Sequence, residues 1–117
     1  MNCANRWRSR KGRIVLDVLA SRLGNDWCVR VTGGDPHIGA VGWSGGGLSA
    51  NSLEFPEHRD RAVVELFLEA LIRVPGRHVV TAGVHLDQIT QREVSDVLEL
   101  CRVLAARVAN ALTQESA

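Results

Sequence analysis

The chain has 117 residues, of which 45% are hydrophobic, and its 14 basic and 13 acidic side chains leave a net charge of +1. This length fits one domain with a single core and excludes a cofactor domain beside a separate substrate domain. The charge balance gives no nucleic-acid footprint over the chain as a whole, and no stretch approaches the roughly 20 apolar residues of a membrane-spanning helix.

The N-terminal segment is rich in arginine and lysine, and we interpret residues 1–12 as a basic arm with a solvated, frayed start. A phosphate-contacting arm is the alternative. The apolar run over residues 14–20 is short, contains an aspartate and leads to no small-residue cleavage site, so it predicts no secretory signal. Cys3, Cys28 and Cys101 form no C-x-x-C pair, which predicts reduced thiols and not a disulfide or zinc site. These features together predict a cytoplasmic protein.

Apolar runs bounded by turn residues predict four strands in the first half of the chain. The predicted strands span residues 14–21, 27–32, 37–43 and 48–55. Gly24-Asn25-Asp26 supplies turn chemistry between the first two strands, so these two are expected to form an antiparallel hairpin.

The hydrophobic period changes from two to 3.6 after Pro56, which predicts an amphipathic helix over about residues 59–74. Residues 78–84 then form a continuously apolar strand, which is typical of a sheet interior. Thr90 and Glu93 have the spacing of a capping box, and this predicts that a second helix begins here. Its expected inner face consists of Val94, Val97, Leu98, Cys101, Leu104, Ala105, Val108 and Leu112.

The predicted order of elements is ββββαβα, which indicates a two-layer α+β domain with a mainly antiparallel sheet and both helices on one face. We assign this domain to residues 13–112, and residues 113–117 to a frayed tail. Two helices cover only one face of such a sheet. A second copy of the chain is therefore expected to cover the other face, and the sequence predicts a homodimer.

Two segments combine glycine, histidine and a carboxylate at the end of an apolar run. They are Thr32-Gly33-Gly34-Asp35-Pro36-His37-Ile38-Gly39-Ala40-Val41 and Ala82-Gly83-Val84-His85-Leu86-Asp87. Glycine permits positive φ angles and close backbone approach, so both segments have the chemistry of loops that present side chains on a scaffold. We expect the two segments to lie within one pocket.

Asp35, His37, His85 and Asp87 are competent metal ligands, so a small metal-dependent enzyme that uses His and Asp is one hypothesis. Their spacing matches no H-E-x-x-H or cysteine-pair motif, and the chain contains neither G-x-S-x-G nor G-x-x-x-x-G-K. We therefore predict no catalytic residue and no metal. Anion binding by backbone N–H groups, at the glycine turn or at the start of the first helix, stays open.

These two segments, with Leu23-Gly24-Asn25-Asp26 before them and Pro56-x-His58-Arg59 between them, resemble the LpdD-like prenylated-flavin chaperone family. The resemblance covers about residues 12–112 and implies a fold similar to that of proteasome assembly chaperones. It also implies a non-catalytic protein that binds reduced prenylated FMN and passes it from a UbiX-like prenyltransferase to a UbiD-like aromatic acid decarboxylase. An assembly or accessory subunit without flavin binding is the alternative. Glu57 stands where the resemblance leads us to expect glycine.

The resemblance also implies a set of flavin-binding residues. The expected phosphate cradle is Gly33, Gly34, His58 and Arg59. His37, His85 and Asp87 are expected to contact the polar edge of the isoalloxazine. Ile38, Val41 and Trp43 are expected to form the apolar wall of the site. The complete candidate cofactor-binding set is Gly33, Gly34, Asp35, Pro36, His37, Ile38, Gly39, His58, Arg59, His85 and Asp87.

Overall fold

The computed structural model describes residues 4–116 and shows a six-stranded sheet with two α-helices and one short 3-10 helix. The elements are β1 (Ala4–Lys11), β2 (Ile14–Leu23), β3 (Asp26–Gly34), β4 (Ala40–Gly45), β5 (Leu48–Glu54), α1 (Arg61–Ala70), η1 (Leu71–Arg73), β6 (His78–His85) and α2 (Gln91–Glu115). The predicted α+β class is confirmed. The predicted order is also confirmed, apart from one additional strand at the N-terminus.

The additional strand is β1, which lies in the segment predicted to be a frayed basic arm. Over Ala4–Lys11 that prediction is wrong, because β1 pairs antiparallel with β2 along its whole length. Arg6, Arg8 and Arg10 are exposed, whereas Trp7 between them packs against the core. This alternation has the period of two that marks a half-buried strand. Cys3 lies outside the described residues.

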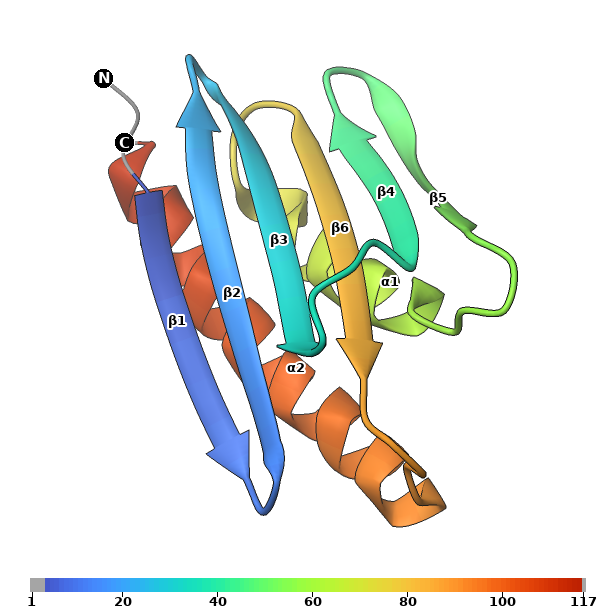
Figure 1. Ribbon diagram of the computed structural model, residues 1–117. Coiled ribbons are helices and arrows are strands. Elements are labelled where there is room, and N and C mark those ends of the chain that lie inside the picture. The colour runs from blue at the N-terminus through green and yellow to red at the C-terminus, as the bar shows by residue number, and fades with distance from the viewer. Residues whose placement is uncertain (1–3, 117) are drawn as a thin grey trace.

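The strands lie in the order β1-β2-β3-β6-β4-β5 (Figure 1). The last strand in the sequence, β6, therefore occupies an interior position, as its continuous apolar character predicted. It is parallel to β3 and antiparallel to β4, and every other pairing is antiparallel, including the predicted β2–β3 hairpin. Because β6 separates β3 from β4, the chain that connects these two strands must cross β6.

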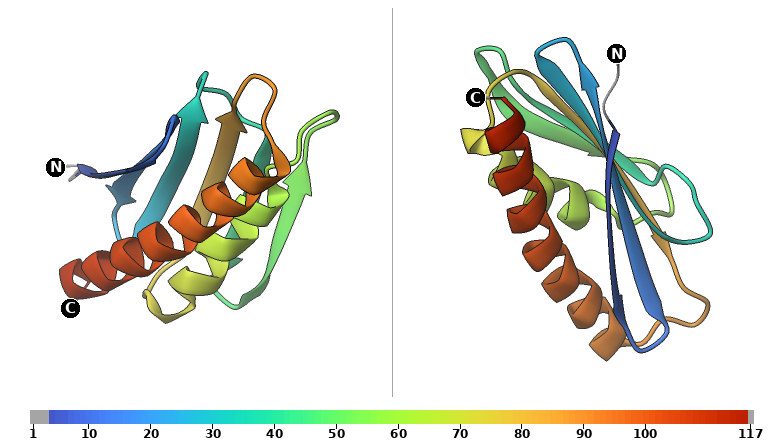
Figure 2. Two further views of the ribbon diagram at one scale, coloured as in Figure 1. Left: turned by 90° about the horizontal axis from the view of Figure 1, so that it is seen from below. Right: turned by 90° about the vertical axis from the view of Figure 1, so that its left-hand side faces the viewer.

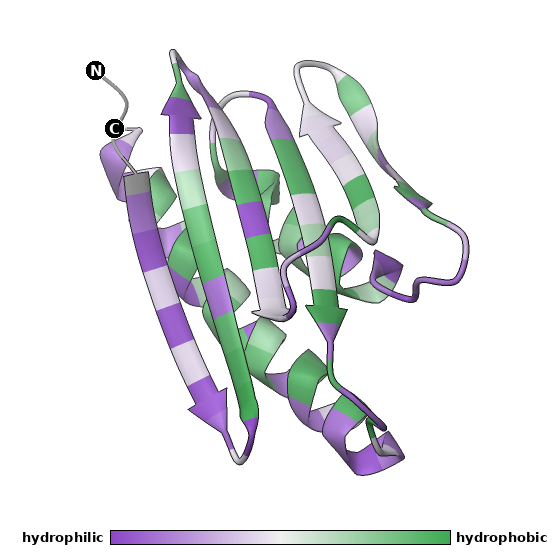
Figure 3. Ribbon diagram, viewed as in Figure 1, coloured by the Kyte–Doolittle hydropathy of each residue, from purple (hydrophilic) through white to green (hydrophobic). Residues whose placement is uncertain are grey.

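Both helices cover the same face of the sheet (Figure 2), as predicted. The core lies between them and the sheet, and its largest fully buried side chains are Trp27, Phe67, Leu16, Leu71, Leu104 and Leu112. Hydropathy follows this arrangement, since β2 and β6 carry long apolar stretches and β1 is largely hydrophilic (Figure 3). The opposite face of the sheet, which we call the open face, has no helix over it (Figure 2).

The second helix begins as predicted, because Thr90 and Glu93 form a complete capping box. The Arg13 guanidinium and the Thr90 backbone both hydrogen-bond the Glu93 carboxylate and lower its pKa to about 2.

Val94 was expected to face inward, but it is 43% exposed because it lies in the first turn of the helix, before the buried stripe begins at Val97. Burial raises the pKa of the Cys101 thiol to about 12.

Several boundaries differ from the predicted ones, and three of them bear on the site or the domain limits. The strand expected from residue 37 begins at Ala40, the first helix begins at Arg61, and α2 continues through Glu115 into the predicted tail. The first difference has a topological cause, since residues 35–39 form the crossing over β6. Across residues 4–116, no helix is long and apolar enough to span a membrane.

Candidate functional site

The crossing loop, residues 35–39, passes over β6 on the open face (Figure 1). It is fixed there by a hydrogen bond of 2.8 Å from the Gly39 N–H to the Ala82 carbonyl. Gly83 lies directly beneath the loop. A Cβ at Gly83 would come within 1.9 Å of the His37 carbonyl oxygen, so glycine is required for the loop to approach β6 this closely.

Gly33 and Gly34 are also explained by close packing. A Cβ at Gly33 would lie 2.7 Å from the Leu16 side chain, on the core side of the sheet. Gly34 has a φ of 72°, and a Cβ there would come within 1.8 Å of the His85 carbonyl oxygen. Packing alone therefore accounts for both glycines, and their role in a phosphate cradle stays a prediction.

Three histidines meet beside the crossing loop. The ring centroid of His37 lies 5.0 Å from that of His58 and 6.5 Å from that of His85. His37 comes from the crossing loop, His58 from the turn before α1 and His85 from the end of β6. The predicted convergence of the two glycine–histidine segments is confirmed.

Asp60 completes this group, which we call the imidazole cluster: His37, His58, Asp60 and His85. The Asp60 side chain is only 7% exposed. Its Oδ1 accepts a hydrogen bond of 3.0 Å from the Val84 N–H, and its Oδ2 lies 3.5 Å from His37 Nε2 and 3.9 Å from His58 Nδ1. Glycine is required at position 39 as well, because a Cβ there would overlap Asp60 Oδ2, at 1.7 Å.

Sequence reasoning missed Asp60, because the first helix was expected to begin before it. Asp60 is in fact the N-cap residue of α1, yet its side chain makes no capping hydrogen bond. An aspartate directly before an amphipathic run is a signal for an N-cap. That signal would have placed Asp60 at the helix start, although not its side chain on β6.

The remaining predicted residues lie around the imidazole cluster. Asp35 is exposed, and its backbone carbonyl lies 2.9 Å from His37 Nδ1. Asp87 is exposed beside His85, with 3.1 Å between its Oδ1 and the His85 Nε2. Arg59 is exposed. Glu57, where glycine was expected, has a φ of 67°, a conformation that favours glycine.

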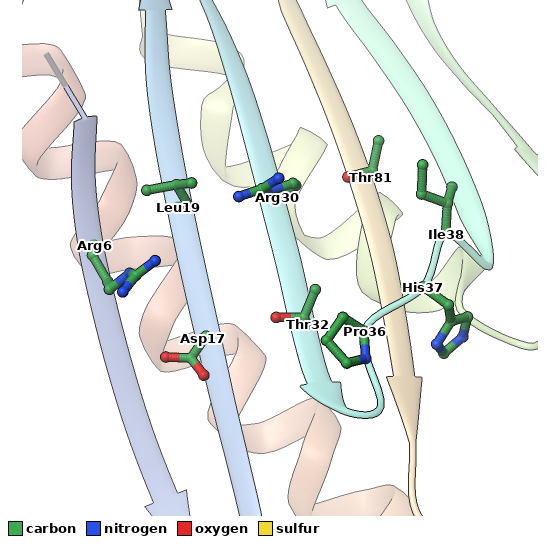
Figure 4. Close-up of a pocket in the computed structure, with 9 residues that line it drawn as sticks. All are labelled: Arg6, Asp17, Leu19, Arg30, Thr32, Pro36, His37, Ile38 and Thr81. Carbon is green, nitrogen blue, oxygen red and sulfur yellow. The ribbon is translucent and has the colours of Figure 1, made fainter.

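A pocket of about 400 Å³ lies on the open face next to the crossing loop (Figure 4). Its lining consists of Arg6, Asp17, Leu19, Arg30, Thr32, Pro36, His37, Ile38 and Thr81. No residue of the second predicted segment, 82–87, lines this pocket, so the two segments meet at the histidines and not here. His37 alone belongs to both the pocket and the imidazole cluster.

The two ends of the pocket differ in chemistry. At one end Arg6 from β1 and Arg30 from β3 extend toward β2, on which Leu19 and Asp17 lie (Figure 4). Asp17 is paired with Arg8 at 2.8 Å, and this hydrogen bond raises the pKa of Arg8. Arg6 and Arg30 make no ion pair with any residue from 4 to 116. The pocket therefore carries two free cations at this end.

The other end of the pocket adjoins an apolar area on the open face. Ile38 is 56% exposed, and the half-buried Val41 and Trp43 follow it on β4. Register places Val41 opposite Leu53 and Trp43 opposite Val79, and both partners are exposed. The predicted apolar wall residues thus lie side by side, on the half of the sheet away from the arginines.

Comparisons with known proteins give a family, a relative and a solved structure that this chain resembles. A family model described as "Prenylated flavin chaperone LpdD-like domain" matches residues 10–113. Protein LpdD of Lactiplantibacillus plantarum is 29% identical over 87 residues, which are 68% of this chain and span 64% of that relative's length. A chain from a chaperone complex for yeast 20S proteasome assembly superposes with a TM-score of 0.50 at 10% identity, covering 91% of this chain and 98% of that one. This last similarity confirms the expected fold.

Proposed function

Because the chain belongs to the prenylated flavin chaperone LpdD-like family, we propose that it binds reduced prenylated FMN. In this proposal it delivers the cofactor from a UbiX-like prenyltransferase to a UbiD-like aromatic acid decarboxylase. The protein itself performs no chemical step. Its task is to hold the flavin and release it to a partner.

The observation that carries this proposal is the pocket of the open face. Its volume falls within the range of small-molecule sites, and it joins two free guanidinium groups to an apolar border. A flavin mononucleotide has the same division, with a dianionic phosphate at one end and a large apolar ring system at the other. We assign the phosphate to Arg6 and Arg30, and the ring system to the side of Pro36, His37 and Ile38.

The cationic end replaces the phosphate cradle expected from the resemblance. Guanidinium groups bind phosphate through charge-assisted hydrogen bonds in which both partners are ionised, and these bonds are frequently bidentate. His58 and Arg59 lie away from this end and do not line the pocket. In our proposal His37 provides a polar contact at the ring, while His85 and Asp87 border the site.

Replacing His37 with alanine is expected to weaken binding of reduced prenylated FMN by about fivefold to a hundredfold without loss of folding. One neutral hydrogen bond contributes roughly 1 kcal/mol and one to a charged partner about 1.5–3 kcal/mol. His85→Ala is expected to weaken binding over the same range. Binding is measured under anaerobic conditions by flavin fluorescence or native mass spectrometry.

Thermal melting of both variants provides the control for this experiment. If a variant melts well below the parent, yet its folded fraction binds the flavin with unchanged affinity, that histidine is structural. If the parent protein binds neither reduced prenylated FMN nor FMN, the accessory-subunit alternative replaces the flavin-chaperone proposal.

We also propose that the chain forms a homodimer through the apolar half of the open face. Trp43, Val79 and Leu53 form a contiguous apolar area there, and a second copy would remove it from water. Light scattering in dilute solution is expected to give twice the monomer mass. Trp43→Asp is expected to yield a monomer, with Leu23→Asp as a control, because Leu23 is an exposed apolar residue outside this area. A parent protein of monomer mass would contradict the proposal.

A further inference from the structure

Three residues of the imidazole cluster have ligand atoms at the separations of a metal site. His37, His58 and Asp60 each offer one such atom, and these three atoms all lie within 4.8 Å of one another. In a tetrahedral zinc site, with bonds of about 2.0–2.2 Å, neighbouring ligand atoms are about 3.3 Å apart. The distances of 3.5 Å and 3.9 Å from Asp60 Oδ2 to the two imidazole nitrogens therefore need only a small contraction.

The hydrogen bonds of His37 show which of its nitrogens is free. Its Nδ1 lies 2.9 Å from the Asp35 carbonyl oxygen, and a carbonyl can only accept, so Nδ1 carries the proton. In a neutral ring Nε2 then has a lone pair, and it faces Asp60. Metal-bound histidines commonly donate their other N–H to a backbone carbonyl, which fixes the tautomer in this way.

Asp60 needs a positive partner at the same point. Its side chain is 93% buried, and only Oδ1 is satisfied, by the Val84 N–H. Oδ2 has no hydrogen bond to any residue in the described part of the chain, and it faces a nitrogen lone pair. A cation between these two electron-rich atoms, which lie 3.5 Å apart, would compensate the charge of the carboxylate that Asp60 buries.

We propose that His37, His58 and Asp60 bind one divalent transition-metal ion of the zinc class. Two imidazoles and one carboxylate are suitable ligands for zinc, and three protein ligands leave a coordination position open for water or an anionic ligand. This set differs from the one considered from the sequence, since it contains neither Asp35, His85 nor Asp87. The crossing loop and the turn before α1 are thereby joined through Asp60.

A proton on His37 is the competing explanation, because an imidazolium would form an ion pair with Asp60. That ion pair is closer for His37, at 3.5 Å, than for His58, whose Nδ1 lies 3.9 Å from the same oxygen, beyond hydrogen-bond distance. A metal ion accounts for the position of both rings at once, and this difference determines the experiment.

Zinc binding is measured by calorimetric titration of the untagged, chelator-treated full chain, and cobalt(II) absorption reports the coordination number. We expect one ion per chain. His58→Gln and Asp60→Asn are each expected to weaken binding by more than about 100-fold, beyond the effect usual for a residue outside the ligand set. His85→Gln is the matched control, because it removes a neighbouring imidazole that is not a ligand, and it is expected to retain the parent affinity.

The variants are chosen so that folding does not obscure the result. Asp60→Asn keeps an oxygen that can accept from the Val84 N–H, and His58 has a side chain that is 38% exposed. Zinc is also expected to raise the melting temperature of the parent but not of these two variants. No binding, or equal weakening in His85→Gln, would overturn the proposal in favour of the ion pair. The titration contains no flavin, so its failure leaves the proposed chaperone function standing, and the reverse also holds.

Discussion

Replacing Gly34 with alanine is expected to lower the free energy of unfolding by roughly 2–5 kcal/mol. An L-residue at positive φ costs about 1–2 kcal/mol, and Gly34 has a φ of 72°. The added Cβ also overlaps the His85 carbonyl oxygen, which belongs to the backbone of the neighbouring strand and cannot rotate away. Forced shifts of this kind typically cost about 1–3 kcal/mol. Urea denaturation followed by circular dichroism measures the change.

Gly24→Ala is the matched control for this variant. Gly24 has a φ of 61°, but a Cβ there meets nothing within 4 Å. The control therefore carries the conformational cost alone, about 1–2 kcal/mol. The difference between the two variants measures the contact between the ends of β3 and β6. Equal losses would show that this contact is looser than described.

Replacing both Arg6 and Arg30 with glutamine is expected to weaken FMN binding by about a hundredfold or more. Each of the two substitutions removes a charge-assisted hydrogen bond to phosphate, and one such bond contributes about 1.5–3 kcal/mol. Riboflavin has the same ring system without the phosphate, so its affinity is expected to stay unchanged. Fluorescence titration with the two flavins, side by side, gives both values.

The double variant also changes the net charge by two, which needs its own control. Arg10→Gln combined with Arg102→Gln makes the same change at two exposed positions that do not line the pocket. We expect this control to bind FMN as the parent does at moderate salt, because screening weakens distant charges. Equal weakening in both double variants would mean that the arginines act through net charge, and our phosphate assignment would be wrong.

Local sequence patterns predicted most of the elements correctly. The period of 3.6 found both helices, and the capping box at Thr90 and Glu93 gave the start of α2 to the residue. β1 was missed because its charge was read as a solvated arm, although Trp7 between arginines carried the strand signal. Charge describes only the exposed face of a strand, whereas the fold depends on the buried one.

The site was predicted less completely, because it depends on which strands become neighbours. Periodicity cannot show that β6 lies between β3 and β4, and this insertion is what brings His37 and His85 together. The β1-β2-β3 order separately brings Arg6 and Arg30 to one pocket, from the two strands that flank β2. The insertion also explains Gly34 and Gly83, where a Cβ would overlap the backbone of His85 and of His37.

The interior position of β6 also sets the order in which the protein becomes complete during synthesis. Residues up to Glu54 contain five of the six strands, but β3 and β4 are not neighbours and cannot form one sheet without β6. A nascent chain that ends before His78 therefore holds two separate sheet fragments with open edges, a state prone to wrong pairing. The two fragments become one continuous sheet only when β6 has left the ribosome and pairs with β3 and β4. The imidazole cluster includes His85 at the end of β6, so it assembles at the same stage. The imidazole cluster, and with it the proposed metal site, is consequently complete only in a chain that includes β6.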